Sequence, residues 1–287
     1  MPLVENSLLE NFEDFLQSHL PKAPSFHPTY DDALKEMLKA GGKRFRPLML
    51  LEVVKAYRPE LIDNSFWVAC GIEFLHTYSL IHDDLPTFDD ASLRRGHQTL
   101  HVTYDEVTAT LVGDALNTHS FLMIADAPLS EKIKISLIRE LSQNGGTSGM
   151  VLGQAIDCYF EDKKLTIDEL TYLHIHKTAK LIAASLKMGA IISGVDKKIE
   201  ELLYEIGLEI GLLFQVQDDI IDATFTSSEA GKPTNNDSSK NSFTNLLGVD
   251  GAISERERLK SKIEIKLDEL NPSLRDSLQK IIDIYFK

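Results

Sequence analysis

The sequence predicts an all-α fold that forms one domain over residues 1–287. One observation is a stretch without proline between Pro128 and Pro233, rich in Leu, Ile, Ala, Lys and Glu at helical spacing. A second is a set of helix-start signals, at Thr166–Glu169, Ser254–Glu257 and Asn271–Pro272. A third is that no sustained alternation of apolar and polar residues marks half-buried strands.

Breaks between the expected helices come from proline, glycine and polar runs. A first amphipathic helix is followed by a loop containing Pro21, Pro24 and Pro28. The run Asn144–Gly149 separates two further helices, and the polar segment from Thr226 to Asn245 predicts a long surface loop of the kind that often forms a lid. Other expected helix ends or bends lie near Pro47, Pro59, Pro86 and Pro128. No segment resembles a linker, so one domain is expected.

Charge and composition exclude several classes of partner. A net charge of −14 argues against nucleic acid and anionic membranes, because both bind basic surfaces. No apolar run reaches the ~18 residues of a transmembrane helix, so stable membrane insertion is not expected. Cys70 and Cys158 lie among apolar neighbours and do not form a disulfide framework, and the first residues lack a signal pattern. Buried thiols and a cytoplasmic location are expected.

Two aspartate clusters stand out, Asp83-Asp84 with Asp89 and Asp218-Asp219 with Asp222. Each lies in a mostly apolar stretch, where unpaired carboxylates are costly unless they bind cations. Oxygen ligands favour hard cations, and Mg²⁺ fills its remaining positions with water and substrate phosphates. The clusters therefore predict a cavity with divalent cations and a phosphate or diphosphate substrate. Taken singly, either cluster is equally consistent with an acidic helix end on a solvated surface.

Helical spacing indicates how these carboxylates are arranged. Gln215, Asp218 and Asp222 share one helix face. Asp83 and Asp89 are six residues apart and would lie on different faces of an uninterrupted helix. Pro86 is expected to end or distort that helix, which would let Asp89 fold back toward Asp83.

Cations cluster as well. Lys43, Arg44 and Arg46 follow a glycine pair, and Arg94-Arg95 follow the first aspartates. Arginine forks suit phosphate oxygens, although either group alone is also consistent with a solvated basic turn. Lys177 lies in an apolar helix, Leu173 to Met188, where lysine can also extend to solvent. His82, close to Asp83, is expected to be an ordinary hydrogen-bonded histidine.

An ordered series of segments over about residues 41 to 248 resembles the trans-prenyltransferase (polyprenyl synthase) family, and within it the bacterial farnesyl diphosphate synthases. The segments are Gly42–Pro47, His76–Pro86, Leu93–Gly96, Gly113–Leu116, Gly149–Met150, Gly153–Gln154, Lys177–Thr178 and Phe214–Asp219. The resemblance implies the isoprenoid synthase fold, with long helices around a central cavity. It also implies three Mg²⁺ ions whose coordination substrate completes, and a homodimer.

The resemblance also implies a reaction. Dimethylallyl diphosphate, and then geranyl diphosphate, loses its diphosphate to give an allylic cation, which isopentenyl diphosphate attacks head-to-tail before a proton is lost. Mg²⁺ and basic side chains would stabilise the departing diphosphate. An apolar pocket would protect the cation from water. The product would be farnesyl diphosphate.

Roles carry over by motif position. For the metal sites, the resemblance implies Asp83, Asp84, Asp89, Asp218, Asp219 and Asp222. For the allylic diphosphate it implies Arg94, Lys177 and Lys232, and for isopentenyl diphosphate it implies Lys43, Arg46, His76 and Arg95. Thr178 and Gln215 would face the developing cation. The chain departs from the family at Asp90–Ser92, where outer acids are missing, and around Lys232 and Lys240, where the match is loose.

Tyr78 and Ser79 precede Asp83 by five and four residues, about 6–7.5 Å along a helix axis. A tyrosine there could close the floor of the product cavity, and the resemblance associates an aromatic at this position with a C15 product. Tyr78 could also be an ordinary core aromatic. The alternative assignments are a geranylgeranyl or other short-chain synthase, a terpene cyclase and a non-catalytic prenyltransferase subunit.

Two of these alternatives and one further class conflict with particular residues. A cyclase would not need Lys43, Arg46 and His76. A non-catalytic subunit should have lost aspartates, and both clusters are intact. A metal phosphohydrolase, suggested by His82-Asp83, would require further histidine ligands at suitable spacing, which the sequence does not supply.

Overall fold

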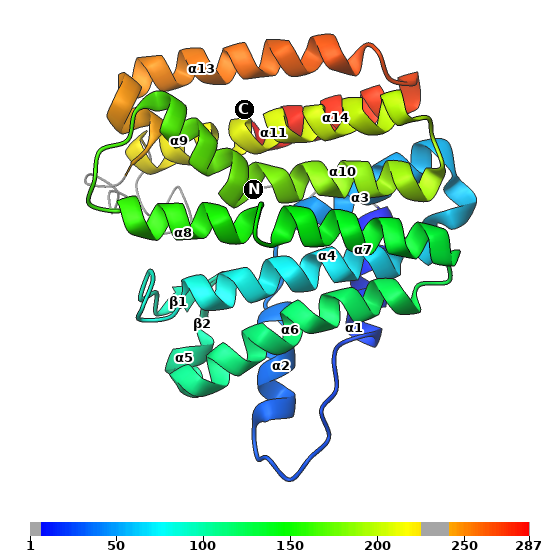
Figure 1. Cartoon of the computed structure of the whole chain (residues 1–287), viewed down its shortest axis with the longest axis vertical. Helices are drawn as coiled ribbons and strands as arrows, with labels where there is room; N and C mark the ends of the chain where they lie inside the picture. Colours follow the sequence, from blue (N-terminus) through cyan, green and yellow to red (C-terminus); the bar gives the residue numbers. More distant parts are fainter. Residues whose placement is uncertain (1–6, 225–240, 287) are drawn as a thin grey trace. The chain divides into compact units, whose positions relative to one another are not determined.

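The computed structural model describes residues 7–224 and 241–286, and Figure 1 shows the helices that they form. The only strands in these ranges are β1 (Leu93–Arg94) and β2 (His97–Gln98), which pair antiparallel. The all-α prediction is confirmed. The chain divides into two compact units, Met1–Ile138 and Arg139–Lys287. One functional domain over residues 1–287 stays a prediction.

The first unit is built from helices of one to six turns. They are α1 (Ser7–Ser18), α2 (Tyr30–Lys39), α3 (Phe45–Tyr57), the 3₁₀ helix η1 (Pro59–Leu61), α4 (Ile62–Asp83), α5 (Leu100–Thr103) and α6 (Glu106–Asp126). The loop between α1 and α2 contains Pro21, Pro24 and Pro28, as predicted. Helix α7 (Glu131–Gly145) runs across the boundary between the units.

Helix α4 is the core of the first unit. It is apolar around most of its circumference, and such a helix is stable only when other elements cover it. Helices α3 and α6 pack against it, and Figure 1 shows α4 and α6 side by side. At Gly71 a Cβ atom would lie 2.7 Å from the carbonyl oxygen of Ser120, so glycine permits the close approach of α6. Because this packing holds α4 in place, it also sets the positions of the polar residues on that helix.

The second unit contains α8 (Met150–Phe160), α9 (Ile167–His174), the π-helix η2 (Ile175–Ala179), α10 (Lys180–Ser193), α11 (Lys197–Thr224), α13 (Phe243–Leu267) and α14 (Pro272–Tyr285). Helix α11 packs against α10 and α13. Two predicted helix starts are confirmed: Thr166 forms a capping box with Glu169, and Asn271 caps α14, in which Pro272 is the first residue.

Three sequence-based expectations were wrong in detail. Ser254–Glu257 does not start a helix, because the break in α13 falls at Gly248, where φ is 72° and glycine avoids the strain of a side chain. The predicted loop to Asn245 is too long, because α13 begins at Phe243, and residues 225–240 of that loop lie outside the described part. Cys158 is exposed, whereas Cys70 is buried as expected, because residue 158 lies on the outer face of α8.

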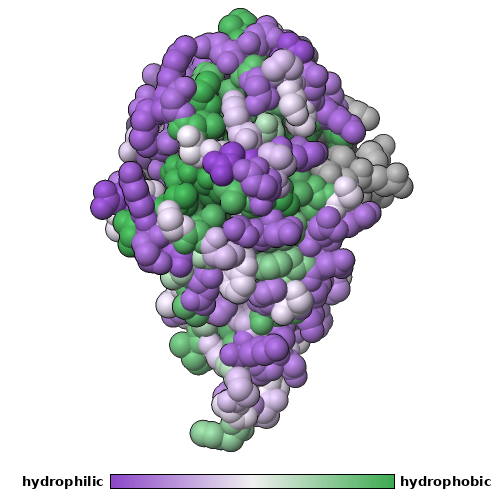
Figure 2. All heavy atoms as spheres, turned by 90° about the vertical axis from the view of Figure 1, so that its right-hand side faces the viewer, coloured by the Kyte–Doolittle hydropathy of each residue, from purple (hydrophilic) through white to green (hydrophobic). Residues whose placement is uncertain are grey.

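Within the described ranges, none of the helices combines the length and apolar character that crossing a bilayer requires. The face in Figure 2 is mostly hydrophilic, with apolar patches between the polar side chains. A surface of this kind is ordinary for a folded chain whose acidic residues outnumber its basic ones by 44 to 30.

Candidate active site

The first aspartate cluster lies where α4 ends. Asp83 is the last helical residue, and the backbone N–H of Asp84 donates to the carbonyl of Leu80. The chain then turns back, and the N–H of Asp89 donates to the carbonyl of Asp83 at 2.9 Å. The expectation that the helix ends near Pro86 and that Asp89 folds back toward Asp83 is confirmed.

Asp84 is buried and paired with Arg94. Strand β1 presents Arg94, whose Nε and Nη2 lie 2.7 and 2.5 Å from Asp84 Oδ1. Burial raises the pKa of Asp84, and Arg94 opposes that rise. A predicted metal ligand and a predicted diphosphate ligand are therefore held together by charge.

The donor set at this end of α4 suits a hard cation. Asp83, Asp84 and Asp89 offer carboxylate oxygens, the ligands that Mg²⁺ prefers. Among the residues that the structure describes, however, no three His, Cys, Asp or Glu side chains converge on one metal position. A cation at this end of α4 would therefore need oxygen atoms from water or substrate to complete its coordination.

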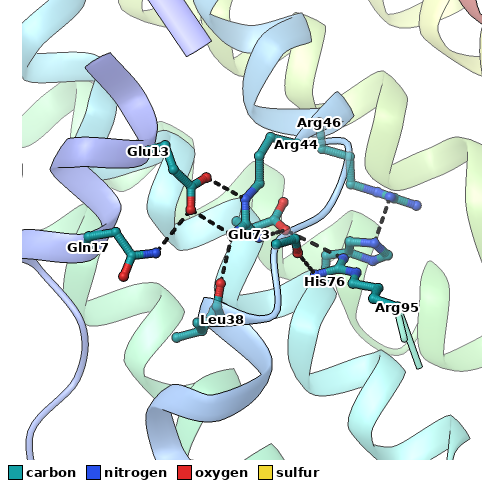
Figure 3. Close-up of polar contacts among 9 residues, drawn as sticks. Glu13, Gln17, Leu38, Arg44, Arg46, Glu73, His76 and Arg95 are labelled. Atoms are coloured by element: carbon teal, nitrogen blue, oxygen red, sulfur yellow. Dashed lines mark hydrogen bonds and ion pairs between the residues drawn. The ribbon is translucent and has the colours of Figure 1, made fainter. Parts of the chain in front are cut away.

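A cation cluster lies two turns earlier on α4. Arg46 Nη1 donates to His76 Nε2 at 3.1 Å (Figure 3). Arginine has no acceptor, so His76 Nε2 must accept, and a neutral ring then carries its proton on Nδ1. Burial lowers the pKa of His76 well below its ordinary value, and Arg46 and Arg95 add to the effect, so the neutral ring is favoured. Burial lowers the pKa of Arg46 to about 10.

Two donors of this cluster stand out. Arg46 Nε and His76 Nδ1 are buried and have no hydrogen-bond partner among the described residues. Buried donors without acceptors are rare and costly in folded proteins. An anion with several oxygens, such as a diphosphate, would satisfy both.

Arg95 belongs to the same cluster. Its Nη1 donates to the carbonyl of Gly41, and its Nη2 lies 3.8 Å from Glu73 Oε1. At Gly42, where φ is 142°, any side chain would be strained, and a Cβ atom would lie 2.7 Å from Arg95 Cζ, so glycine favours the close approach of the guanidinium. Lys43 follows, with its side chain exposed. The structure thus brings Arg46, His76 and Arg95 together.

In the second unit, Lys177 and Thr178 lie in the π-helix η2, a distortion that is frequent at functional sites. Lys177 Nζ donates to Asp157 Oδ2 at 2.5 Å. A Cβ atom at Gly153 would lie 2.1 Å from Lys177 N, so glycine lets α8 reach the backbone of η2. Sequence reasoning missed Asp157, although a lone carboxylate in the apolar helix Met150–Phe160 was a signal for it.

Helix α11 carries the second cluster. Thr178 Oγ1 donates to Gln215 Oε1 at 2.8 Å, so these two predicted residues lie together. Gln215, Asp218 and Asp222 are all half-buried. This equal burial agrees with the prediction that they share one face of the helix. One oxygen of Asp219, Oδ2, accepts from the N–H of Phe243 at 2.6 Å, where α13 begins. Lys232 lies outside the described residues.

The predicted chain-length residues lie on α4. Tyr78 is buried, and its ring packs edge-on against His82 with centroids 5.6 Å apart. Ser79 donates to the carbonyl of His76. His82 Nε2 lies within hydrogen-bond distance, 3.0 Å, of the carbonyl of Thr110, so the expected hydrogen bond is confirmed.

Comparisons with known proteins identify the family. A model of the polyprenyl synthetase family matches residues 27–281. The chain belongs to the polyprenyl synthetase family. It is 43% identical to a farnesyl diphosphate synthase of Geobacillus stearothermophilus over 237 residues, covering 81% of this chain and 78% of that protein. It is 37% identical to geranylgeranyl pyrophosphate synthase 9 of Arabidopsis thaliana over 257 residues, covering 85% and 70%.

A solved structure is similar over nearly its whole length. It is a geranyltransferase from Helicobacter pylori, complexed with magnesium and isoprenyl diphosphate, with 49% identity and a TM-score of 0.91 over 98% of this chain and 95% of that one. The isoprenoid synthase fold expected from the sequence is confirmed.

Proposed function

We propose that this chain is a farnesyl diphosphate synthase. It condenses isopentenyl diphosphate with dimethylallyl diphosphate and then with geranyl diphosphate. The observation that carries the proposal is the pair of charge clusters on α4. His76 with Arg46 and Arg95 forms a cluster of donors, and Asp83 lies seven residues later with the carboxylates, about 10 Å along the axis. A cluster of cations and a cluster of carboxylates suit two diphosphates, one bound without metal and one bound through it.

Mg²⁺ is the cofactor that the carboxylate clusters fit. We propose three ions, held by Asp83, Asp84 and Asp89 and by Asp218, Asp219 and Asp222, with substrate and water oxygens completing the coordination. When bound, Mg²⁺ would neutralise charge on the diphosphate that leaves.

The side chains have separate roles in this proposal. Arg94, Lys177 and Lys232 bind the allylic diphosphate. Lys43, Arg46, His76 and Arg95 bind isopentenyl diphosphate. The hydrogen bond from Thr178 to Gln215 fixes the direction of both dipoles, so the oxygen atoms can face a developing allylic cation.

Product length is set by Tyr78 in this proposal. Its burial one to two turns before Asp83 supports a closed cavity floor, with Ser79 beside it. The higher identity to a farnesyl synthase than to a geranylgeranyl synthase, 43% against 37%, points the same way. A geranylgeranyl synthase is the second candidate.

Assembly and location complete the proposal. We expect a homodimer, supported by apolar side chains exposed on α6, namely Val107, Leu111 and Leu122. Exposed apolar stripes often mark interfaces. The cytoplasmic location rests on composition alone, a chain with two cysteines and no disulfide framework.

The test is incubation with isopentenyl diphosphate, each allylic primer in turn and Mg²⁺, followed by product sizing. A C15 product from dimethylallyl and geranyl diphosphate is expected. A C20 product would support the geranylgeranyl alternative, and cyclisation of a single allylic diphosphate would overturn the two-site assignment.

The two-site assignment has its own test. Lys43→Ala should raise mainly the KM for isopentenyl diphosphate, and Arg94→Ala mainly the KM for the allylic primer. If both variants weakened the same substrate, the division of roles would be wrong.

A further inference from the structure

Arg44 lies beside the cation cluster but points away from it. It is 3% exposed and is the N-cap of α3, in the left-handed region with φ 46°. Its Nε and Nη2 donate to the two oxygens of Glu13 at 2.9 and 3.1 Å, and its Nη1 donates to Glu73 at 2.8 Å (Figure 3). Burial opposes the charge of Arg44, yet these ion pairs raise its pKa. The guanidinium is thus bound by protein groups on all sides.

One bond of Arg44 closes a turn. Its Nη2 also donates to the carbonyl of Leu38 at 2.7 Å, in the last turn of α2. The bond therefore joins the end of α2 to the start of α3. Between them lies the turn with Gly41, whose carbonyl accepts from Arg95, and with Lys43. Fixing this turn positions Lys43 and the acceptor that holds Arg95.

Glu73 connects Arg44 to Arg95. Its Oε1 lies 2.8 Å from Arg44 Nη1 and 3.8 Å from Arg95 Nη2, and its side chain is 1% exposed. Arg44 is buried and Arg95 is half-buried, so one carboxylate shared between them would leave an excess positive charge, which burial makes costly. Glu13 supplies the second negative charge, so Arg44 and Arg95 are balanced by Glu13 and Glu73.

We propose that Arg44 and Glu13 are positioning residues for the isopentenyl diphosphate site. They fix the turn that carries Lys43 and holds Arg95, without touching substrate. Glu13 lies in α1, outside the residues 27–281 that the family model matches, so α1 becomes part of the support of the site. Phe12 and Leu16, both fully buried, fix α1 in place. This inference rests on the proposed function.

Glu13→Gln is the primary test. The amide keeps the size of the side chain, but its NH₂ group faces the donors of Arg44 and the bidentate ion pair is lost. We expect the KM for isopentenyl diphosphate to rise about threefold to fivefold, the upper part of the range for a partly exposed ion pair. The kcat and the KM for geranyl diphosphate should stay within about twofold of the wild type. Glu10→Gln, an exposed position one turn earlier on α1, is the matched control and should change none of them.

Arg44→Lys is the second test. Lysine keeps the charge but cannot make the fork to Glu13, Glu73 and Leu38 together, so a rise in the same KM of about tenfold or more is expected. Thermal unfolding of each variant, measured alongside, identifies a variant that has lost its fold. A folded Glu13→Gln protein with unchanged KM, or with kcat and both KM values altered alike, would overturn the inference.

A failure of the proposed function can be distinguished from a failure of the positioning role of Arg44 and Glu13. If wild-type protein does not condense the two diphosphates, the function is wrong. In that case the inference is tested by measuring, with calorimetry and without metal, how tightly inorganic pyrophosphate binds. Weaker binding in Glu13→Gln than in Glu10→Gln supports a positioning role, and equal binding rules it out.

Discussion

His174 makes the stability of the protein depend on pH. It is 6% exposed, stacks on Phe243 with centroids 5.5 Å apart, and neither ring nitrogen has a hydrogen-bond partner among the described residues. Burial lowers its pKa from 6.5 to about 4, and Lys177 acts in the same direction, whereas Asp157 and Asp218 oppose the change. The folded protein therefore holds this ring neutral.

The sign and size of the effect follow from proton binding. Between pH 6.5 and about 4 the unfolded chain binds a proton at His174 that the folded chain does not. The stability that the neutral His174 ring contributes is therefore fully present above pH 6.5. It is lost as the pH falls from 6.5 to about 4 and changes no further at lower pH. Since each pKa unit is worth about 1.4 kcal/mol, the loss amounts to about 3 kcal/mol.

His174→Phe removes the titrating group and keeps an aromatic ring on Phe243. We expect the free energy of unfolding, from urea titrations followed by circular dichroism, to fall between pH 7 and pH 4 by about 3 kcal/mol less than in the wild type. Phe243→Leu is the control, because it disturbs the same packing and leaves His174 in place. Since it also removes part of the cover that buries His174, its acid loss should remain but be no larger than that of the wild type. An acid loss in His174→Phe as large as the wild type's would refute the reasoning.

Three further predictions concern the site. Asp83→Ala or Asp218→Ala should reduce turnover by orders of magnitude with the helical circular dichroism signal intact, because an oxygen ligand is lost; near-normal turnover in a folded variant would contradict the metal assignment. Tyr78→Ala should lengthen the product to C20 or more in a chain-length assay, and a product that still stops at C15 would place the cavity floor elsewhere. Gly153→Ala should destabilise the fold by about 1–3 kcal/mol in thermal or urea unfolding, since its Cβ would meet Lys177 N at 2.1 Å; unchanged stability would mean that η2 can shift.

The sequence predicted those features that depend on local pattern. The end of α4 near Pro86 and the return of Asp89 toward Asp83 follow from the geometry of proline in a helix. The caps at Thr166 and Asn271 follow from short side chains that accept from nearby N–H groups. Such signals extend over only a few residues, so they can be found in one sequence without any knowledge of tertiary contacts.

The features that sequence reasoning missed depend on residues far apart in the chain. Glu13 and Arg44 are separated by 31 positions, and Lys177 and Asp157 by 20, so no local spacing reveals these pairs. The capping box expected at Ser254 failed for a different, local reason. Position 248 holds a glycine, and α13 is interrupted at that residue rather than at Ser254. Glu73 and Asp157 could have been suspected as lone carboxylates in apolar helices, but their partners could not.

The pairing of charges divides the predicted diphosphate ligands into two kinds. Arg94 is bound to the buried carboxylate of Asp84, and Lys177 is bound to the partly exposed carboxylate of Asp157, each within its own unit. A phosphate can bind these cations only if it displaces or supplements a carboxylate. Because Asp84 is also a proposed Mg²⁺ ligand, metal loading would weaken its hold on Arg94 and so couple allylic binding to the metal.

The other cluster is organised differently. Arg46 donates to a neutral His76, and the nearest carboxylate to Arg95 is Glu73 at 3.8 Å, which Arg44 already binds more closely. An incoming diphosphate would meet unsatisfied donors there and displace no carboxylate. That difference in charge pairing accounts for how one protein could hold two similar anions in distinct ways, one dependent on metal and one not. The partly exposed ion pair of Arg44 and Glu13 would fix the turn on which the second anion depends.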